Sequence, residues 1–336
     1  MDQVVRLKDV AEKAGVGLGT ASRALNNHPS VKDETRKLVL DAAKELNYKA
    51  NFIAKGLRSK YTQTVGVVIP DISSAFFPEV VRGIEDIADQ FNYNIILSSS
   101  DLNKEKEIDT LYMLKAKMAD GVIFLSNTID GELRDVLLEL GVPVVLVSTR
   151  SKSSDLICVS IDNEKAAFDA VDYLCGLGHR KIAMISGKFD DPNSGIPRVQ
   201  GYKRALKKHG IEIDETLIYE GNYKYQSGYE NTMKLLQRSD LPTAIFAASD
   251  EMAIGVSRAI LESGKRIPED FSVMGFDGIE SAAFFYPSIT TVRQPRYEMG
   301  MEAMRLLLRL LNKETVKEGN VMMNHEIIKR NSCKSI

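Results

Sequence analysis

Near the start of the chain, Thr20, Ser22 and Arg23 place two hydroxyl groups and one guanidinium group within four residues. Hydroxyl groups hydrogen-bond phosphate oxygens, and an arginine can donate two parallel hydrogen bonds to the edge of a guanine base. Gly17 and Gly19 carry no side chain, so they would let the backbone approach a duplex closely. This pattern is typical of a helix that enters the major groove of DNA. A helical hairpin packed in an ordinary protein core is the alternative.

Two short helices within residues 7–26 are expected to position these groups. Gly15 lies in the turn between them, where a left-handed backbone would strain any side chain. A third helix is expected over residues 33–46, because its apolar residues recur along one stripe. That stripe consists of Leu38, Val39, Ala42 and Leu46. Three helices in so short a segment form a minimal bundle with a small core.

Charge is distributed unevenly along the 336 residues. Residues 1–60 hold 12 Lys and Arg against 7 Asp and Glu, a net charge of +5, whereas the remainder carries −7. A basic arm on an acidic body suits a polyanionic partner at one end of the molecule. The three cysteines are odd in number and far apart, which excludes a disulfide framework and a zinc finger. Because no signal segment and no membrane-spanning apolar run is present, we expect a cytoplasmic protein without membrane contact.

From residue 64 onward, apolar runs alternate with amphipathic helical segments. Continuous apolar strands joined by helical crossovers predict parallel sheets covered on both faces. These units are too many for one compact sheet, so the fold predicted is an all-α helix-turn-helix head followed by a two-lobed α/β body. Strands are predicted at 65–69, 95–98, 121–125, 144–147, 159–161, 181–185, 243–247 and 272–275. Helices are predicted at 78–91, 104–115, 132–140, 163–177, 198–209, 225–238, 251–263 and 295–311.

Several polar residues follow the predicted strands directly. They are Asp71, Ser73, Ser148, Asp162, Asp250 and Asp277. Ligands of open α/β sheets bind at the carboxyl ends of strands, here in a cleft between the two lobes. The sequence has no phosphate-binding loop, no Gly-x-Ser-x-Gly elbow and no histidine cluster with metal-ligand spacing. We therefore expect binding without catalysis, with no cofactor and no metal.

A resemblance extends these inferences. Residues 7–26, followed by the pattern Tyr48…Asn51-x-x-Ala54-x-x-Leu57, resemble the DNA-binding head and hinge helix of the LacI/GalR family of bacterial transcription regulators. That family has a body like that of periplasmic binding proteins. Further strings are similar to the catabolite control branch of the family, at 66–73, 82–88, 93–98, 166–171, 201–206 and 303–307.

For the head, the resemblance implies a homodimer on a pseudo-palindromic, double-stranded operator. It implies that Leu18, Gly19 and Arg23 reach bases, that Thr20 and Ser22 bond phosphates, and that Leu57 intercalates at the operator centre. Asn51 would join them as a phosphate contact. Three residues depart from the family pattern: Gly17 replaces a serine, Ala21 a valine, and Ala50 a proline. The implied boundaries are a head at 1–49, a hinge at 50–60, one lobe at 61–162 with 294–320, and another at 163–293 with 321–336.

For the cleft, the resemblance implies that Arg198 and Asp277 hold effector hydroxyl groups and that Tyr223 stacks on the ligand. Ser73, Ser148 and Asp250 complete the predicted effector set, and the effector would be a sugar or a sugar phosphate. Such a ligand can be bound by a carboxylate that accepts hydrogen bonds from vicinal hydroxyls and by an arginine that donates two parallel hydrogen bonds. One departure is that Ser148-Thr149 stands where sugar-binding members usually offer an aspartate. A surface arginine and a turn-forming aspartate are the alternative explanation of Arg198 and Asp277.

The predicted helix after Pro295 has an apolar stripe and a charged one. In the catabolite control branch, this helix docks a serine-phosphorylated phosphocarrier protein, and Arg305 matches the arginine that takes the phosphate. Tyr297 and Glu298 keep the character found there. Glu302 stands where the branch carries an aliphatic residue, and its carboxylate would repel a phosphate. A solvated face with charge pairs along the helix is the alternative.

Taken together, the sequence predicts a DNA-binding repressor of carbohydrate or catabolite genes. Its operator affinity would be controlled by a sugar-type effector or by the phosphorylated phosphocarrier corepressor. A free small-sugar-binding protein without a DNA function would use the same body and is the second hypothesis. An enzyme acting on a sugar phosphate is the third.

Overall fold

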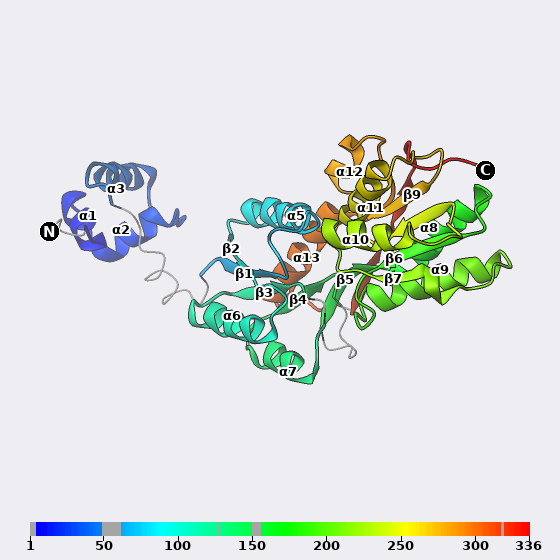
Figure 1. Ribbon diagram of the computed structural model, residues 1–336. Helices are drawn as coiled ribbons and strands as arrows, with labels where there is room; N and C mark the ends of the chain where they lie inside the picture. The colour runs from blue at the N-terminus through cyan, green and yellow to red at the C-terminus, as the bar shows by residue number, and fades with distance from the viewer. Residues whose placement is uncertain (1–4, 49–61, 127, 150–155, 317–318) are drawn as a thin grey trace. The chain divides into compact units, whose positions relative to one another are not determined.

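The computed structural model describes residues 5–48, 62–126, 128–149, 156–316 and 319–336 (Figure 1). The chain divides into two compact units, Met1–Thr62 and Gln63–Ile336. The first is the predicted helical head and the second is the predicted α/β body. Among the described residues, none of the helices is both long enough and apolar enough to cross a membrane.

The head consists of α1 (Leu7–Lys13), α2 (Leu18–Leu25) and α3 (Asp33–Glu45). Gly15 has a φ of +65°, so the predicted left-handed turn between the first two helices is present. Val10, Ala21 and Val39 are fully buried and form the centre of the small core.

One prediction for the head was wrong. Leu38 does not belong to the buried stripe of α3, because 58% of its surface is exposed. Adjacent helical residues are separated by about 100°, so Leu38 and Val39 cannot both face the same core. Val39 faces inward together with Ala42 and Ala43, and small alanines suffice because α1 and α2 pack close to α3.

The body contains two sheets of six described strands each. The first has the order β11-β5-β4-β3-β1-β2, and the second has the order β12-β10-β9-β8-β6-β7. In the first sheet the strands are β1 (Thr64–Ile69), β2 (Asn94–Ser99), β3 (Gly121–Phe124), β4 (Val144–Val147), β5 (Ile157–Ile161) and β11 (Asn320–Met323). In the second they are β6 (Ile182–Ser186), β7 (Ile218–Glu220), β8 (Ala244–Ala247), β9 (Ser272–Asp277), β10 (Thr290–Arg293) and β12 (Glu326–Ile328).

Nearly all of these strand pairs are parallel, as the apolar runs predict. The exception is the edge strand β12, which pairs antiparallel with β10. The short strands β7, β10, β11 and β12 were not predicted as strands, because polar residues shorten the apolar run in each of them. Between the sheets the chain passes from β5 to α8, from β10 to α13, and from β11 to β12.

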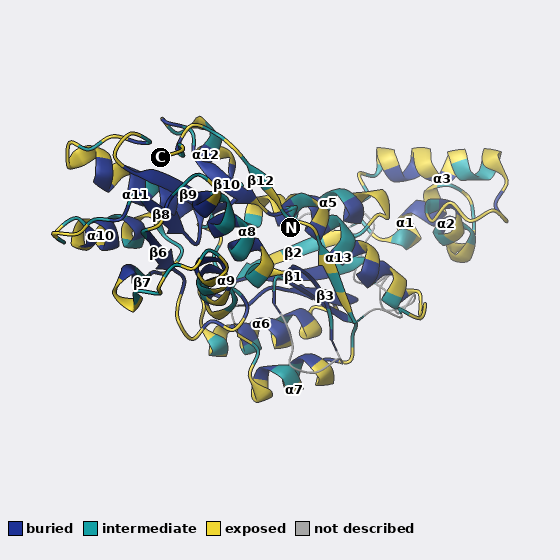
Figure 2. Ribbon diagram, turned by 90° about the vertical axis from the view of Figure 1, so that its right-hand side faces the viewer, coloured by how far each residue is buried: buried dark blue, intermediate teal, exposed yellow. Residues whose placement is uncertain are grey.

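Helices cover both faces of each sheet, as expected for parallel strands. On the first sheet these are α5 (Phe77–Gln90), α6 (Lys104–Ala116), α7 (Gly131–Glu139) and α13 (Arg296–Leu311). On the second they are α8 (Asn163–Gly176), α9 (Gly195–Lys208), α10 (Tyr225–Leu235), α11 (Asp250–Glu262) and the short α12 (Glu280–Phe284). Figure 2 shows the central strands buried beneath helices whose outer faces are exposed.

Helices α5 and α13 approach each other unusually closely. A Cβ atom at Gly83 would lie 2.0 Å from the carbonyl oxygen of Tyr297, and one at Gly300 would lie 2.0 Å from that of Val80. Only glycine therefore fits at these two positions. The close crossing fixes the start of α13 against the first lobe.

Candidate functional site

The predicted recognition helix presents its polar groups outward. Gly17 precedes α2 in an extended conformation, and no side chain caps the helix. Leu18, Gly19 and Arg23 are exposed, and Thr20 and Ser22 are half-buried. Buried Ala21 and Ala24 occupy the opposite side of the helix. Space is open at Gly19, where an added Cβ would meet nothing within 4 Å.

The predicted contacts Asn51 and Leu57 lie outside the described residues. Polar contacts that stabilise the described part of the head do not involve the outer face of α2. Lys13 on α1 pairs with Glu45 on α3 at 2.6 Å. Arg36 donates to the carbonyl oxygens of His28 and Val31, which fixes the loop after α2.

A cleft lies between the two lobes of the body at the carboxyl ends of the strands. It encloses about 850 Å³, counted with the space open to solvent. Four predicted effector residues line it: Ser148, Arg198, Tyr223 and Asp277. Segments from both lobes contribute to this lining, so a ligand there would contact both.

Arg198 projects from the first turn of α9 and is buried. Its Nε donates to Asn163 Oδ1 at 2.9 Å, and its Nη1 donates to the carbonyl oxygen of Ala248 at 2.5 Å. The guanidinium plane also lies 3.7 Å from the centroid of the Phe276 ring. An arginine held on two edges and one face is fixed in orientation, and its remaining N–H groups are oriented toward whatever enters the cleft.

Asp277 ends β9 and has a φ of 116°, a value that a residue with a side chain rarely adopts. Gln294 Nε2 donates to its Oδ1 at 2.8 Å. Burial raises the pKa of Asp277 to about 6, although the positive charges of Arg198 and Arg296 act in the opposite direction. The side chain is thus a hydrogen-bond acceptor that titrates close to neutral pH.

Tyr223 is placed by a hydrogen bond from its hydroxyl group to Asp191 Oδ2, at 2.7 Å. Asp191 is itself buried and accepts from the backbone N–H groups of Asn193 and Gly195. Gly187 makes room for the ring, because a Cβ atom there would overlap the Tyr223 hydroxyl. The ring lies 5.9 Å from the Arg198 guanidinium group, so an aromatic face borders the cleft.

Two predicted effector residues do not line the cleft. The carboxylate of Asp250 is fully buried and accepts from Gly278 N, Ile279 N and Thr291 Oγ1, at 2.6 to 2.8 Å. Burial and the charge of Asp277 raise the pKa of Asp250 to about 7, against the effect of those three donors. Asp250 therefore holds the turn that follows Asp277. Ser73 is exposed and contacts Asp71 and Lys224 instead.

Ser148 and Thr149, which depart from the family pattern, have separate roles. Thr149 Oγ1 donates to the carbonyl oxygen of Ser126 and accepts from the Ser126 amide, so it ties β3 to β4. Ser148 has a φ of 54°, and its Oγ is buried without a hydrogen-bond partner among the residues that the structure describes. A buried hydroxyl that lines a cleft and lacks a partner is available to a ligand.

The structure also adds cleft residues that sequence reasoning did not single out. Asn163 and Gln294 orient Arg198 and Asp277, and Lys224 and Glu251 line the cleft from the second lobe. Gln294 follows β10 directly, so a recognised strand there would have indicated it by the same rule as Asp277. Nothing in the local sequence of Lys224 indicates its position.

The third predicted set lies on α13. Tyr297 donates to Asp86 Oδ2 of α5 at 2.8 Å, and Arg82 pairs with the same carboxylate at 2.7 Å. Glu298 is exposed, and the exposed Arg305 lies 4.0 Å from Glu302. Tyr297 is thus engaged within the protein, whereas the Arg305 guanidinium group is only loosely paired.

Comparison with known proteins places these features in a family. Residues 6–51 match the model of bacterial regulatory proteins of the lacI family, and residues 171–333 match a periplasmic binding protein-like domain. Catabolite control protein A of Priestia megaterium is 44% identical over 330 residues, which cover 98% of this chain and 99% of that protein.

Two solved structures share the fold along nearly the whole chain. The lac repressor dimer bound to operator and the anti-inducer ONPF has a TM-score of 0.89 at 29% identity, covering 99% of this chain and 100% of that one. A complex of the transcriptional regulator CelR with cellobiose has a TM-score of 0.75 at 33% identity, covering 98% and 99%. A sugar-binding protein without a DNA function would not carry the matched head. The chain therefore belongs to the lacI family of bacterial regulatory proteins and is a DNA-binding regulator of carbohydrate genes.

Proposed function

We propose that the protein is a repressor that binds a pseudo-palindromic operator, with the outer face of α2 in the major groove. The observation that carries this proposal is the exposed Arg23, whose side chain has no hydrogen-bond partner among the described residues. It is free to donate a fork to a guanine edge, while Thr20 and Ser22 bond phosphates. Gly19 offers no side chain, so discrimination depends on Arg23, Leu18 and the deformability of the DNA.

The head is proposed to span residues 1–49 and to be followed by a hinge at 50–60, in which Asn51 and Leu57 contact the operator. The lobes are proposed to comprise 61–162 with 294–320, and 163–293 with 321–336. The body performs no reaction in this proposal, and a bound signal acts through its different affinity for two arrangements of the lobes.

A second copy of the chain completes the proposed operator-binding unit. Phe284 and Tyr286 are 82% and 88% exposed, far more than aromatic side chains on a monomer surface usually are. Tyr225 is also exposed, and its hydroxyl group bonds Ser281 on α12, which places it beside Phe284. We propose that these aromatics pack against a second copy. In sedimentation velocity, Phe284→Glu should raise the dimer dissociation constant, whereas Tyr112→Glu, a matched change on the first lobe, should not.

The cleft is proposed to take a small hydroxylated effector, a sugar or a sugar phosphate. Arg198 donates to it, Asp277 accepts from it, Tyr223 borders its apolar face, and Ser148 Oγ gains a partner. This proposal is supported by the buried and pre-positioned side chains of Arg198 and Asp277, because a donor and an acceptor of opposite charge can both bond vicinal hydroxyls. Isothermal titration of the full-length protein with a panel of sugars and sugar phosphates tests this, with Arg198→Met as the control that should bind none.

The exposed charged stripe of α13 is proposed as a docking face for a serine-phosphorylated phosphocarrier protein. Arg305 would take the phosphate, with Tyr297 and Glu298 beside it. Glu302 opposes this role because its carboxylate lies near the same guanidinium group. Glu302→Met should therefore tighten binding of the phosphorylated carrier, and Arg305→Glu should abolish it. Binding that survives Arg305→Glu would remove this part of the proposal.

The decisive experiment for repression is selection of duplexes from a random pool by the purified full-length protein. An enriched two-fold symmetric sequence is expected, and Arg23→Met should lose the enrichment at one base pair of each half-site. If repeated selection enriches no sequence, sequence-specific repression by this chain is contradicted.

A further inference from the structure

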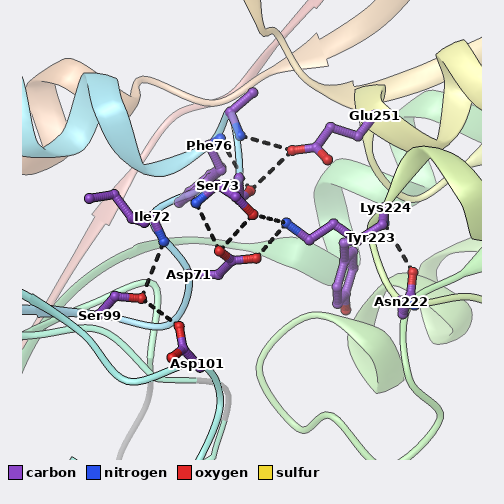
Figure 3. Close-up of polar contacts among 12 residues, drawn as sticks. Asp71, Ile72, Ser73, Phe76, Ser99, Asp101, Asn222, Tyr223, Lys224 and Glu251 are labelled. Atoms are coloured by element: carbon purple, nitrogen blue, oxygen red, sulfur yellow. Dashed lines mark hydrogen bonds and ion pairs between the residues drawn. The ribbon is translucent and has the colours of Figure 1, made fainter.

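One short segment at the mouth of the cleft carries several of the bonds between the two lobes. This segment, residues 71–76, joins β1 to α5 and is called the strap below (Figure 3). Three charged side chains from beyond the strap bond to it: Lys224, Glu251 and Arg296. Lys224 and Glu251 belong to the second sheet's half of the body, so these bonds cross the cleft.

Lys224 bonds the first end of the strap. Its Nζ lies 2.5 Å from Asp71 Oδ2 and 3.2 Å from Ser73 Oγ. Asp71 Oδ1 accepts from both the amide and the hydroxyl group of Ser73. Partial burial acts to raise the pKa of Asp71, but the bonds from Lys224 and Ser73 outweigh it and lower this pKa to about 2. The Asp71 carboxylate is therefore ionised at neutral pH.

Glu251 bonds the middle of the strap. Only 4% of this residue is exposed, and its Oε1 accepts from Ala75 N at 2.8 Å and from Ser74 Oγ at 3.2 Å. It lies in the first turn of α11, where the positive end of the helix dipole favours a carboxylate. A buried carboxylate needs such donors, because unpaired burial of a charge is costly.

Arg296 bonds the same residue from the other side. Its Nη1 donates to the carbonyl oxygen of Ala75 at 3.0 Å, and its Nη2 donates to that of Gly278 at 3.0 Å. Both backbone polar groups of Ala75 are thus used by side chains far away in the sequence. Gly278 directly follows Asp277, so the strap is linked to the turn that carries a proposed effector contact.

We propose that the strap is an internal latch that favours the closed arrangement of the cleft. Its bonds to Lys224 and Glu251 exist only while the lobes are together, so they favour the closed arrangement over any open one. Asp71, Ser74, Lys224 and Glu251 all line the cleft, which means that an entering ligand meets the groups that form the latch. Effector binding and latch closure are therefore coupled, because the same four residues take part in both. The effect of the latch on operator affinity rests on the proposed function, but the latch itself does not.

Hydrogen exchange on the full-length, ligand-free protein tests the latch. Lys224→Met and Asp71→Asn are expected to speed exchange of the amides of residues 73–76 by up to about fivefold each, as expected for the loss of one partly exposed ion pair. The double variant should show little more than either single change, because both remove the same pair. Lys207→Met, which removes an exposed charge from α9 of the same lobe, should leave exchange in the strap unchanged.

Scattering at small angles should show a larger radius of gyration for Lys224→Met than for the wild type and for Lys207→Met. Unchanged exchange in both single variants would overturn the latch, and so would additive effects in the double variant. Should Lys224→Met fail to fold by circular dichroism, the isosteric Asp71→Asn carries the test alone. Because operator binding is measured separately on the same variants, a failed latch leaves the proposed repressor function standing.

Discussion

The outer face of α2 and the second-lobe wall of the cleft are both proposed binding surfaces, yet they are built in opposite ways. Arg23 on α2 is exposed, and no described residue bonds its side chain. Arg198 in the cleft is buried, bonded at two nitrogens and stacked on an aromatic ring. The head can therefore adapt to its partner, whereas the cleft wall is fixed before a ligand arrives.

Because of this difference, the two arginines should affect ligand affinity and the stability of the fold differently. An exposed arginine contributes to binding alone, because the folded head does not depend on it. A buried arginine that donates to Asn163 and to the carbonyl oxygen of Ala248 contributes to both, since its removal leaves these buried acceptors without a donor. Changes at the two surfaces should thus be distinguishable by comparing binding with thermal unfolding.

Salt should separate the two surfaces most strongly. Raising the salt concentration from 50 to 200 mM is expected to weaken operator binding by about a thousandfold, if about six phosphates are contacted. Effector binding in the cleft should change far less if the effector is uncharged, because its contacts are buried and few counterions are released. Fluorescence anisotropy and titration calorimetry on one preparation make the measurement. Operator binding that is insensitive to salt would contradict the proposed contact between the basic head and operator phosphates.

Matched substitutions of the two arginines give the next largest effect. Arg198→Met should abolish measurable effector binding and destabilise the body by about 1–3 kcal/mol, because the buried Asn163 Oδ1 and the carbonyl oxygen of Ala248 lose their donor. Arg23→Met should cost operator binding about 1–3 kcal/mol and leave the melting temperature unchanged. Calorimetric unfolding together with binding isotherms checks both. Equal effects of the two variants on unfolding would erase the distinction between the surfaces.

The pKa of Asp277 predicts how the cleft responds to pH. Its value of about 6 lies above the ordinary value of 3.8, so the carboxyl group gains a proton as pH falls below 6. Effector affinity should fall about tenfold between pH 7 and pH 5, because the protonated group accepts ligand hydroxyls less well. Since the folded state binds the extra proton, stability from this group should decrease as pH rises from about 4 to 6. Asp277→Asn should remove the part of this pH dependence that comes from Asp277; Asp250, whose pKa is raised to about 7, also titrates in this range but does not line the cleft.

The smallest expected effects are those of substitutions in the head on its free energy of unfolding. Leu38→Ala should change the free energy of unfolding by less than about 0.5 kcal/mol, because the side chain is mostly exposed. Val39→Ala, one residue further, should cost about 1–3 kcal/mol because Val39 is fully buried. Thermal unfolding followed by circular dichroism resolves the two. A larger loss for Leu38→Ala would restore the stripe predicted from the sequence.

Sequence patterns predicted those structural elements that a single local pattern determines. The periodicity of residues 7–26, Gly15 in the turn, and the alternation of apolar runs with amphipathic helices predict the head and the parallel sheets. Arg198 and Asp277 could be named because they lie in recognisable strings. Asp250 was misplaced by the rule that polar residues after strands face a ligand, because three internal donors hold its carboxylate instead. Lys224 and Glu251 depend on contacts between distant segments, which no local pattern encodes.

The central claim is that the exposed face of α2 reads a DNA sequence. The most direct test is anisotropy of a labelled duplex, selected from a random pool, titrated with full-length protein in the presence of excess random duplex. The wild-type protein is predicted to bind the selected duplex at least about a thousandfold more tightly than random DNA. For Arg23→Met, this ratio of affinities is predicted to be at least about tenfold smaller. Equal affinity of the wild-type protein for selected and random duplexes, under every signal supplied, would contradict the account.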